Sequence, residues 1–265
     1  MGLEIEVGAS LKQHSVLVIP CFNEEARLQP AAFAALLEDP RVELLFVNDG
    51  STDGTEAALQ RFADAHGAGA RRRVRVLSMQ QNVGKAEAVR QGMCEALATQ
   101  PYGVGYFDAD LATPPSEILR LLRVLYDREA AVVLGSRIAL LGRHIERSPT
   151  RHYLGRLFAT LASAALSLPV YDTQCGAKLF RGTASLRAAL AEPFISRWAF
   201  DVELIGRLVR GGPNVPPLDV DSFHEEPLLE WHDVAGSKLR ATHMARSLYD
   251  LGQIARSLRA RGKQR

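Results

Sequence analysis

The sequence predicts an α/β fold in which helices cover both faces of a mainly parallel sheet. In the first half of the chain, short runs of β-branched and other apolar residues alternate strictly with longer stretches of helical periodicity. Strands connected through helices run parallel, because each crossover returns the chain to the same end of the sheet. Acidic and polar residues follow directly after several of these runs, where open α/β sheets bind their ligands.

The expected strands lie in the first half of the chain and cover residues 15–20, 43–48, 74–78, 103–107 and 131–134. The helices between them are expected at 24–38, 53–66, 85–99 and from Pro114 or Pro115 onward, where proline suits the first helical turn. Beyond about residue 140 the pattern is less regular. There we expect a helix at 150–167, a loop at 172–176 and helices at 183–190 and 201–210.

No linker-like stretch divides the 265 residues, so one domain is expected over 1–265. Its last part, about 238–265, combines eight basic residues with apolar residues at near-helical spacing. This pattern predicts a basic amphipathic helix at the C-terminus. The basic face of such a helix is either solvated or lies on a membrane surface.

Composition and charge exclude several classes of protein. The chain is 47% hydrophobic and 23% charged, and its formal net charge of +2 argues against a general nucleic-acid binder. The N-terminus lacks the features of a signal peptide, and no apolar run reaches the ~18 residues that span a bilayer. Cys21, Cys94 and Cys175 are far apart, as reduced thiols are. We therefore expect a cytoplasmic protein, either free or peripheral at the cytoplasmic face of a membrane.

Acidic residues follow three of the first four expected strands. Asp108 and Asp110 form the clearest pair, since alternation along an extended segment turns both side chains to the same side. Two carboxylates beside a diphosphate are suitable ligands for Mg²⁺ or Mn²⁺. Asp53 is expected only to cap a helix. The sequence has neither a Gly-x-Gly-x-x-Gly motif after the first strand nor a P-loop, so other groups must neutralise any bound phosphates.

Several ordered motifs carry a family resemblance. The first half contains VIPCFNEE at 18–25, VNDGSTDGT at 47–55, NVGK at 82–85 and DAD at 108–110. The second half contains GSR at 135–137, DTQCGAKLF at 172–180, RWAFDVEL at 197–204 and GSKLR at 236–240. Together they resemble the inverting glycosyltransferases of GT-A fold, which is a Rossmann-like, mainly parallel sheet. Within that family the chain resembles the dolichyl- and polyprenyl-phosphate sugar synthases, above all the dolichyl-phosphate glucosyltransferases.

The resemblance implies a role for each matching residue. The residues implied to bind the nucleotide-sugar are Pro20, Phe22, Glu24, Asp49, Lys85, Asp108 and Lys238. Asp108 and Asp110 would hold Mg²⁺ or Mn²⁺, and Asp110 would thereby take part in catalysis. Arg137, Arg147 and Arg151 would receive the acceptor phosphate, for which forked guanidinium groups are well suited. Arg147 and Arg151 also fit the solvated start of a helix.

The identity of the donor and of the acceptor is expected from the same motifs. Mannose-transferring relatives often have a glutamine where this chain has Ala112, so UDP-glucose is favoured over GDP-mannose. A phosphate acceptor is already ionised near neutral pH and needs no strong base. A hydroxyl acceptor needs a carboxylate base, for which Asp201 is the candidate, although this residue also suits a helix N-terminus.

Three functions follow from this pattern. The first is a hexosyltransferase that acts on a polyprenyl phosphate at a membrane surface, using the apolar face of the helix at 150–167 and the terminal helix. The second is a cytosolic transferase that acts on a small hydroxyl acceptor, in which those apolar faces only close the core. The third is a nucleotide-sugar-binding protein without transfer activity, which the Asp108–Asp110 pair disfavours.

Overall fold

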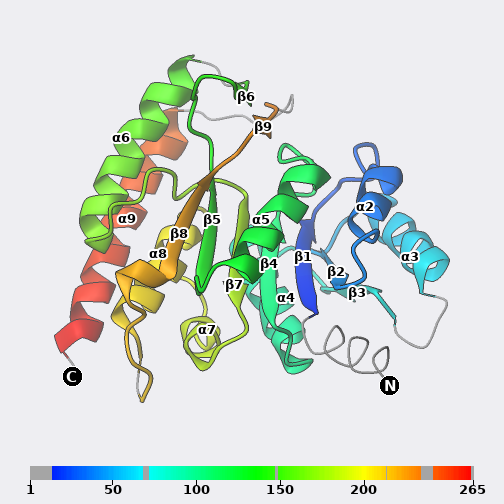
Figure 1. The fold of residues 1–265 in the computed structure, drawn as a ribbon, viewed down its shortest axis with the longest axis horizontal. Helices are drawn as coiled ribbons and strands as arrows, with labels where there is room; N and C mark the ends of the chain where they lie inside the picture. The colour runs from blue at the N-terminus through cyan, green and yellow to red at the C-terminus, as the bar shows by residue number, and fades with distance from the viewer. Residues whose placement is uncertain (1–13, 68–71, 147–148, 213, 234–240, 264–265) are drawn as a thin grey trace.

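A computed structural model describes residues 14–67, 72–146, 149–212, 214–233 and 241–263 (Figure 1). Its central sheet has seven strands in the order β3-β2-β1-β4-β7-β5-β8. In chain order these strands are β1 (Ser15–Cys21), β2 (Val42–Asn48), β3 (Val74–Ser78), β4 (Gly103–Phe107), β5 (Val132–Ser136), β7 (Ala177–Arg181) and β8 (Phe223–Pro227). A separate parallel pair consists of β6 (His144–Ile145) and β9 (Glu230–Trp231).

Alternation along the strands divides the core into two apolar clusters, one on each face of the sheet. In β1, Leu17 and Ile19 belong to one cluster while Val16 and Val18 belong to the other. The first cluster is covered by α2 (Pro30–Leu36), α3 (Thr55–His66) and α5 (Pro115–Asp127). The second is covered by α4 (Lys85–Ala98), α6 (Pro149–Leu166), α7 (Ala184–Leu190), α8 (Phe200–Arg210) and α9 (Ala241–Lys263). The predicted α/β fold with helices on both faces is confirmed.

The expected strands and most expected helices agree with the structure to within two residues, but the helix expected at 24–38 is wrong at its start. It begins only at Pro30, which occupies the first turn of α2. A helix cannot run through this position because proline has no N–H to donate and clashes with the preceding turn. The backbone N–H groups of Arg27 and Leu28 donate to Glu24 in a separate turn instead.

Four short strands were not expected from the sequence, and β7 matters most among them. It runs antiparallel between β4 and β5, whereas all the other pairings are parallel. Gly105 of β4 faces Leu179 of β7, and a Cβ at Gly105 would lie 2.2 Å from a Leu179 methyl carbon. Because β7 is antiparallel, its N-terminal end lies at the same edge as the carboxyl ends of its neighbours.

The two helices expected to have apolar faces pack against each other and against α8 (Figure 1). In α9, Leu251, Ile254 and Leu258 are buried in the core. This apolar stripe therefore closes the core, as one of the two interpretations of the sequence required. Within the described residues, no helix combines the length and the apolarity that a membrane span needs.

Candidate active site

The carboxyl ends of the parallel strands and the start of β7 surround two adjoining cavities. The first cavity has a volume of about 230 Å³ and is lined from β4, α6, the 172–176 loop and α8. The second, of about 290 Å³, is lined from the ends of β1 and β2 and from the start of α4. Lys85, Asp108 and Asp110 line both cavities and so mark their junction.

The second cavity contains most of the residues expected to bind the nucleotide. Pro20, Phe22, Glu24 and Asp49 all line it, although they come from two different strand ends. The Phe22 side chain is 44% exposed, so its ring is available for contact with a ligand. The sequence rule that ligands bind beyond the carboxyl ends of the strands holds for this group. Their role in binding a nucleotide stays a prediction.

Asp49 has a structural task in addition to the expected one. Its carboxylate accepts hydrogen bonds from the backbone N–H groups of Val83 (2.7 Å) and Gly84 (2.9 Å) and from Asn82 Nδ2 (3.0 Å). Burial raises the pKa of Asp49, and the two backbone hydrogen bonds act against this rise. Asp49 thus fixes the loop that leads into α4 and places Lys85 at the junction of the cavities.

Asp108 is held in close contact with both a cation and the backbone. Lys85 Nζ lies 2.5 Å from Asp108 Oδ1, and the Asp108 N–H donates to the Gly176 carbonyl (3.1 Å). A Cβ at Gly176 would lie 2.3 Å from Asp108 Oδ2, so only glycine fits beside this carboxylate. Although burial lowers the pKa of Lys85, the carboxylates of Asp108 and Asp201 outweigh it and the pKa is raised.

Asp110 and Glu24 add negative charge that is less fully compensated. Burial and then the charge of Asp108 raise the pKa of Asp110. Burial also raises the pKa of Glu24, and Asp110 and Asp108 contribute to this rise, while the ion pair with Arg27 lowers it. A divalent cation between Asp108 and Asp110 would relieve this repulsion, and carboxylate oxygens are the ligands it prefers.

The two aspartates therefore fit the expected Mg²⁺ or Mn²⁺. Within the described part of the chain, no three His, Cys, Asp or Glu side chains are arranged to hold a metal ion. The remaining ligands would consequently come from the bound diphosphate and from water, as is usual for Mg²⁺. Ala112, where mannose-transferring relatives often have glutamine, lines the first cavity and offers no side-chain ligand.

Asp201 lies at the start of α8 and lines the first cavity. Its Oδ1 accepts hydrogen bonds from Lys178 Nζ (2.7 Å) and from the Tyr106 hydroxyl. The Lys178 side chain is completely buried, and its ammonium group also donates to the Cys175 carbonyl (2.5 Å). Lys178 and Tyr106 were not identified from the sequence, because only the antiparallel β7 brings them next to Asp201.

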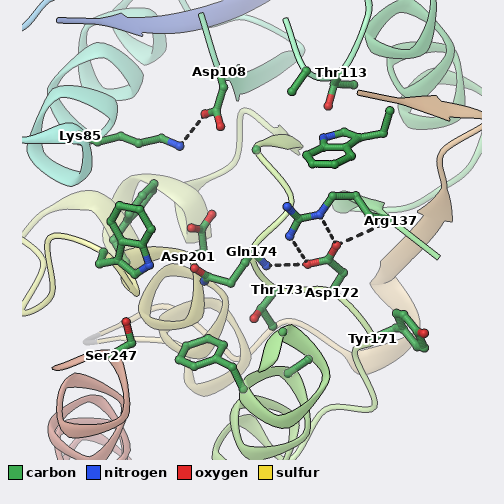
Figure 2. Close-up of a pocket in the computed structure, with 18 of the residues that line it drawn as sticks. Lys85, Asp108, Thr113, Arg137, Tyr171, Asp172, Thr173, Gln174, Asp201 and Ser247 are labelled. Atoms are coloured by element: carbon green, nitrogen blue, oxygen red, sulfur yellow. Dashed lines mark hydrogen bonds and ion pairs between the residues drawn. The ribbon is translucent and has the colours of Figure 1, made fainter. Parts of the chain in front are cut away.

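Arg137 is the only arginine of the expected acceptor set whose side chain the structure describes. It forms a two-point ion pair with Asp172, in which Nε–Oδ2 is 2.7 Å and Nη2–Oδ1 is 2.9 Å, and it stacks on Trp231 (Figure 2). The sequence gave no sign of this partner, although Asp172 lies in the 172–180 motif. Arg147, Lys238 and the side chain of Arg151 lie outside the described residues.

Two further arginines line the first cavity and were not assigned a role from the sequence. Arg156 of α6 stacks on the Tyr171 ring at 3.5 Å and donates to the Tyr171 carbonyl (3.2 Å). Arg197 donates to the Val83 carbonyl (2.8 Å) at the other side of the cavity. The first cavity is therefore lined by several cationic groups, which suits an anionic ligand.

Comparisons with known proteins agree with this geometry. The model of glycosyl transferase family 2 matches residues 16–185. The chain is 30% identical over 261 residues to dolichyl-phosphate beta-glucosyltransferase ALG5C of Trichomonas vaginalis, covering 93% of this chain and 72% of that protein. It is 33% identical over 247 residues to the human dolichyl-phosphate beta-glucosyltransferase, covering 86% and 70%.

A solved structure shows the same fold at lower sequence identity. The UDP complex of glucosyl-3-phosphoglycerate synthase from Mycobacterium tuberculosis superimposes with a TM-score of 0.65 and 18% identity, covering 94% of this chain and 82% of that one. A second structure of that enzyme contains Mn²⁺, UDP-glucose and phosphoglyceric acid, and has the same TM-score of 0.65 at 19% identity, covering 94% and 82%.

We predict that Lys178→Met lowers the free energy of unfolding by about 3 kcal/mol, because it leaves the Asp201 carboxylate buried without its cation. Urea denaturation measures the loss. Adding Asp201→Asn should recover much of it, since a neutral amide needs no cation. The matched control is Lys85→Met, whose ion pair with Asp108 is 42% and 35% exposed and should change stability by less than about 1 kcal/mol. Equal losses in the two single variants would contradict the prediction.

Proposed function

The chain belongs to glycosyl transferase family 2, and on that premise we propose that it transfers glucose from UDP-glucose to a polyprenyl phosphate of the dolichyl type. The observation that carries this proposal is the Asp108–Asp110 pair at the junction of two cavities. One cavity suits the nucleotide and the other suits the sugar and an anionic acceptor. The relatives named dolichyl-phosphate beta-glucosyltransferase support the donor and the acceptor.

Transfer with inversion is a displacement at the anomeric carbon of the sugar. An oxygen of the acceptor phosphate forms the new bond while the bond to the UDP oxygen breaks on the opposite side. Mg²⁺ or Mn²⁺ held by Asp108 and Asp110 would stabilise the charge on the departing diphosphate. The Lys85 ammonium group, 2.5 Å from Asp108, lies where it can add to that stabilisation.

The acceptor needs binding and orientation more than it needs a base. A phosphate monoester has a second pKa near 6 and is mostly ionised at neutral pH, so it can attack without losing a proton to the protein. Arg156 and Arg197, together with the paired Arg137, line the first cavity and can attract it. Arg147 and Arg151 remain proposed partners for the acceptor phosphate.

We also propose that the protein binds peripherally to the cytoplasmic face of a membrane, where a polyprenyl lipid would be. On α6, Tyr153, Leu157 and Leu161 are spaced by four residues and are 73%, 52% and 41% exposed. The same helix lines the first cavity through Arg156 and Phe158. Phe158 is buried, so the exposed apolar stripe is narrower than the helical face expected from the sequence.

The transfer reaction is tested with purified protein, Mn²⁺, UDP-glucose and a polyprenyl phosphate. We predict glucosyl transfer to the phosphate, at least about tenfold slower transfer from GDP-mannose, and competition by UDP but not by GDP. A product on a small hydroxyl acceptor, with none on the lipid phosphate, would favour the second function inferred from the sequence. Preference for GDP-mannose would reverse the proposed donor.

Membrane attachment is tested by flotation with anionic liposomes. Leu157→Glu combined with Leu161→Glu should reduce the floated fraction several-fold, because each buried apolar contact with the bilayer is replaced by a charge that the surface repels. The matched control combines Gln60→Glu and Gln91→Glu, which add the same charge at exposed positions of α3 and α4. If wild-type protein floats at no salt concentration, the proposed attachment is wrong.

A further inference from the structure

Two adjacent side chains in the 172–176 loop have buried polar atoms without hydrogen-bond partners. Gln174 Nε2 and Thr173 Oγ1 are both inaccessible to solvent, and neither has a partner among the described residues. Both residues line the first cavity. Most buried polar groups in folded proteins are paired, because an unpaired one loses its bonds to water without replacement. Such atoms beside a cavity are therefore candidates for contact with a ligand.

The loop that carries Gln174 is held rigidly, so the position of its side chain is not accidental. The Gln174 N–H donates to Asp172 Oδ1 (3.0 Å), and Asp172 is itself held by the two-point ion pair with Arg137. The backbone N–H groups of Tyr171 and Asp172 both donate to the Glu225 carboxylate, each at 2.7 Å. A side chain on a fixed backbone can discriminate between ligands because it does not move to fit a wrong one.

Asp201 presents a complementary group on the same cavity. Lys178 and Tyr106 both donate to its Oδ1, and no described residue donates to Oδ2. Figure 2 shows the Gln174 side chain extending from the Asp172 side of the cavity toward the Asp201 carboxylate. An amide donor and a carboxylate acceptor thus face one space. A hydroxyl group both donates and accepts, so it can satisfy the two together.

The remaining lining suits a ring with polar edges and apolar faces. Trp198 and Trp231 both line this cavity, and Trp198 is 52% exposed. Flat aromatic surfaces combined with a few fixed polar groups are typical of small-molecule sites. The cavity also adjoins Asp108 and Asp110, where the diphosphate is proposed to bind. A sugar attached to that diphosphate would enter this space.

We infer that Gln174 and Asp201 recognise hydroxyl groups of the donor hexose, with Gln174 Nε2 donating and Asp201 Oδ2 accepting, and that this pair sets the sugar specificity. The inference rests on the proposed function, because it takes a nucleotide-linked hexose as the ligand. Thr173 Oγ1 is a third group able to bond a sugar hydroxyl. Lys178 and Tyr106 act as positioning residues, since they occupy one Asp201 oxygen and leave the other for the ligand.

The inference is tested by calorimetry of binding, which does not require the acceptor to be known. The ligands are UDP, UDP-glucose and the four UDP-deoxyglucoses that lack the 2-, 3-, 4- or 6-hydroxyl, each with Mn²⁺. For wild-type protein we expect at least one deoxy ligand to bind tenfold or more weakly than UDP-glucose, because a missing hydroxyl leaves the site's buried polar groups unpaired. Gln174→Leu should weaken UDP-glucose tenfold or more, abolish that discrimination and leave UDP binding unchanged.

Two controls keep the outcomes separate. Gln91→Leu makes the same change at an exposed position of α4 and should bind all ligands as the wild type does. Gln174→Glu keeps the side-chain shape but replaces the donating amide by a carboxylate, and it should lose UDP-glucose affinity even where Gln174→Leu fails to fold. Unchanged UDP-glucose affinity in both Gln174 variants, or an equal loss for UDP, would overturn the inference and leave the proposed function intact. Wild-type protein that binds no UDP-sugar would overturn both.

Discussion

The antiparallel pairing of β7 between β4 and β5 is the constraint on which the site depends. It brings the start of one strand to the edge where the neighbouring strands end, so that the Gly176 carbonyl accepts a hydrogen bond from the N–H of Asp108. The same pairing places Lys178 beside Asp201 of α8 and the 172–176 loop against the first cavity. An all-parallel arrangement would carry the start of β7 to the opposite edge and separate these groups.

The charges at this edge are compensated in pairs, with one exception. Asp108 pairs with Lys85, Asp172 with Arg137, and Asp201 with Lys178. Across the described ranges of the chain, no ion pair is formed by Asp110, and its pKa is raised by burial and by Asp108. Burying a carboxylate beside another one is unfavourable unless a cation offsets the charge. This residual charge lies where the two cavities meet, and it is the physical reason for placing the divalent metal there.

The sequence predicted the parallel part of the sheet well because buried strands such as Leu44–Val47 are continuous apolar runs. It did not predict β7 or β8, since AKLFR and FHEEP contain charged residues and are too short to show a period. Residues at strand ends, such as Glu24 and Asp110, could be placed at one edge from topology alone. Lys178, Tyr106 and Gln174 could not, because their positions depend on a strand pairing and on side-chain contacts between distant segments.

The central claim is that Asp108 and Asp110 hold a divalent metal that binds the diphosphate of the donor. Calorimetry of UDP binding, with and without Mn²⁺, tests it directly when wild-type protein is compared with Asp110→Asn. We expect Mn²⁺ to increase the affinity of the wild type for UDP tenfold or more. In the variant, the metal-free affinity should persist while the increase is lost. An Asp110→Asn variant that keeps the full Mn²⁺-dependent gain would contradict the claim.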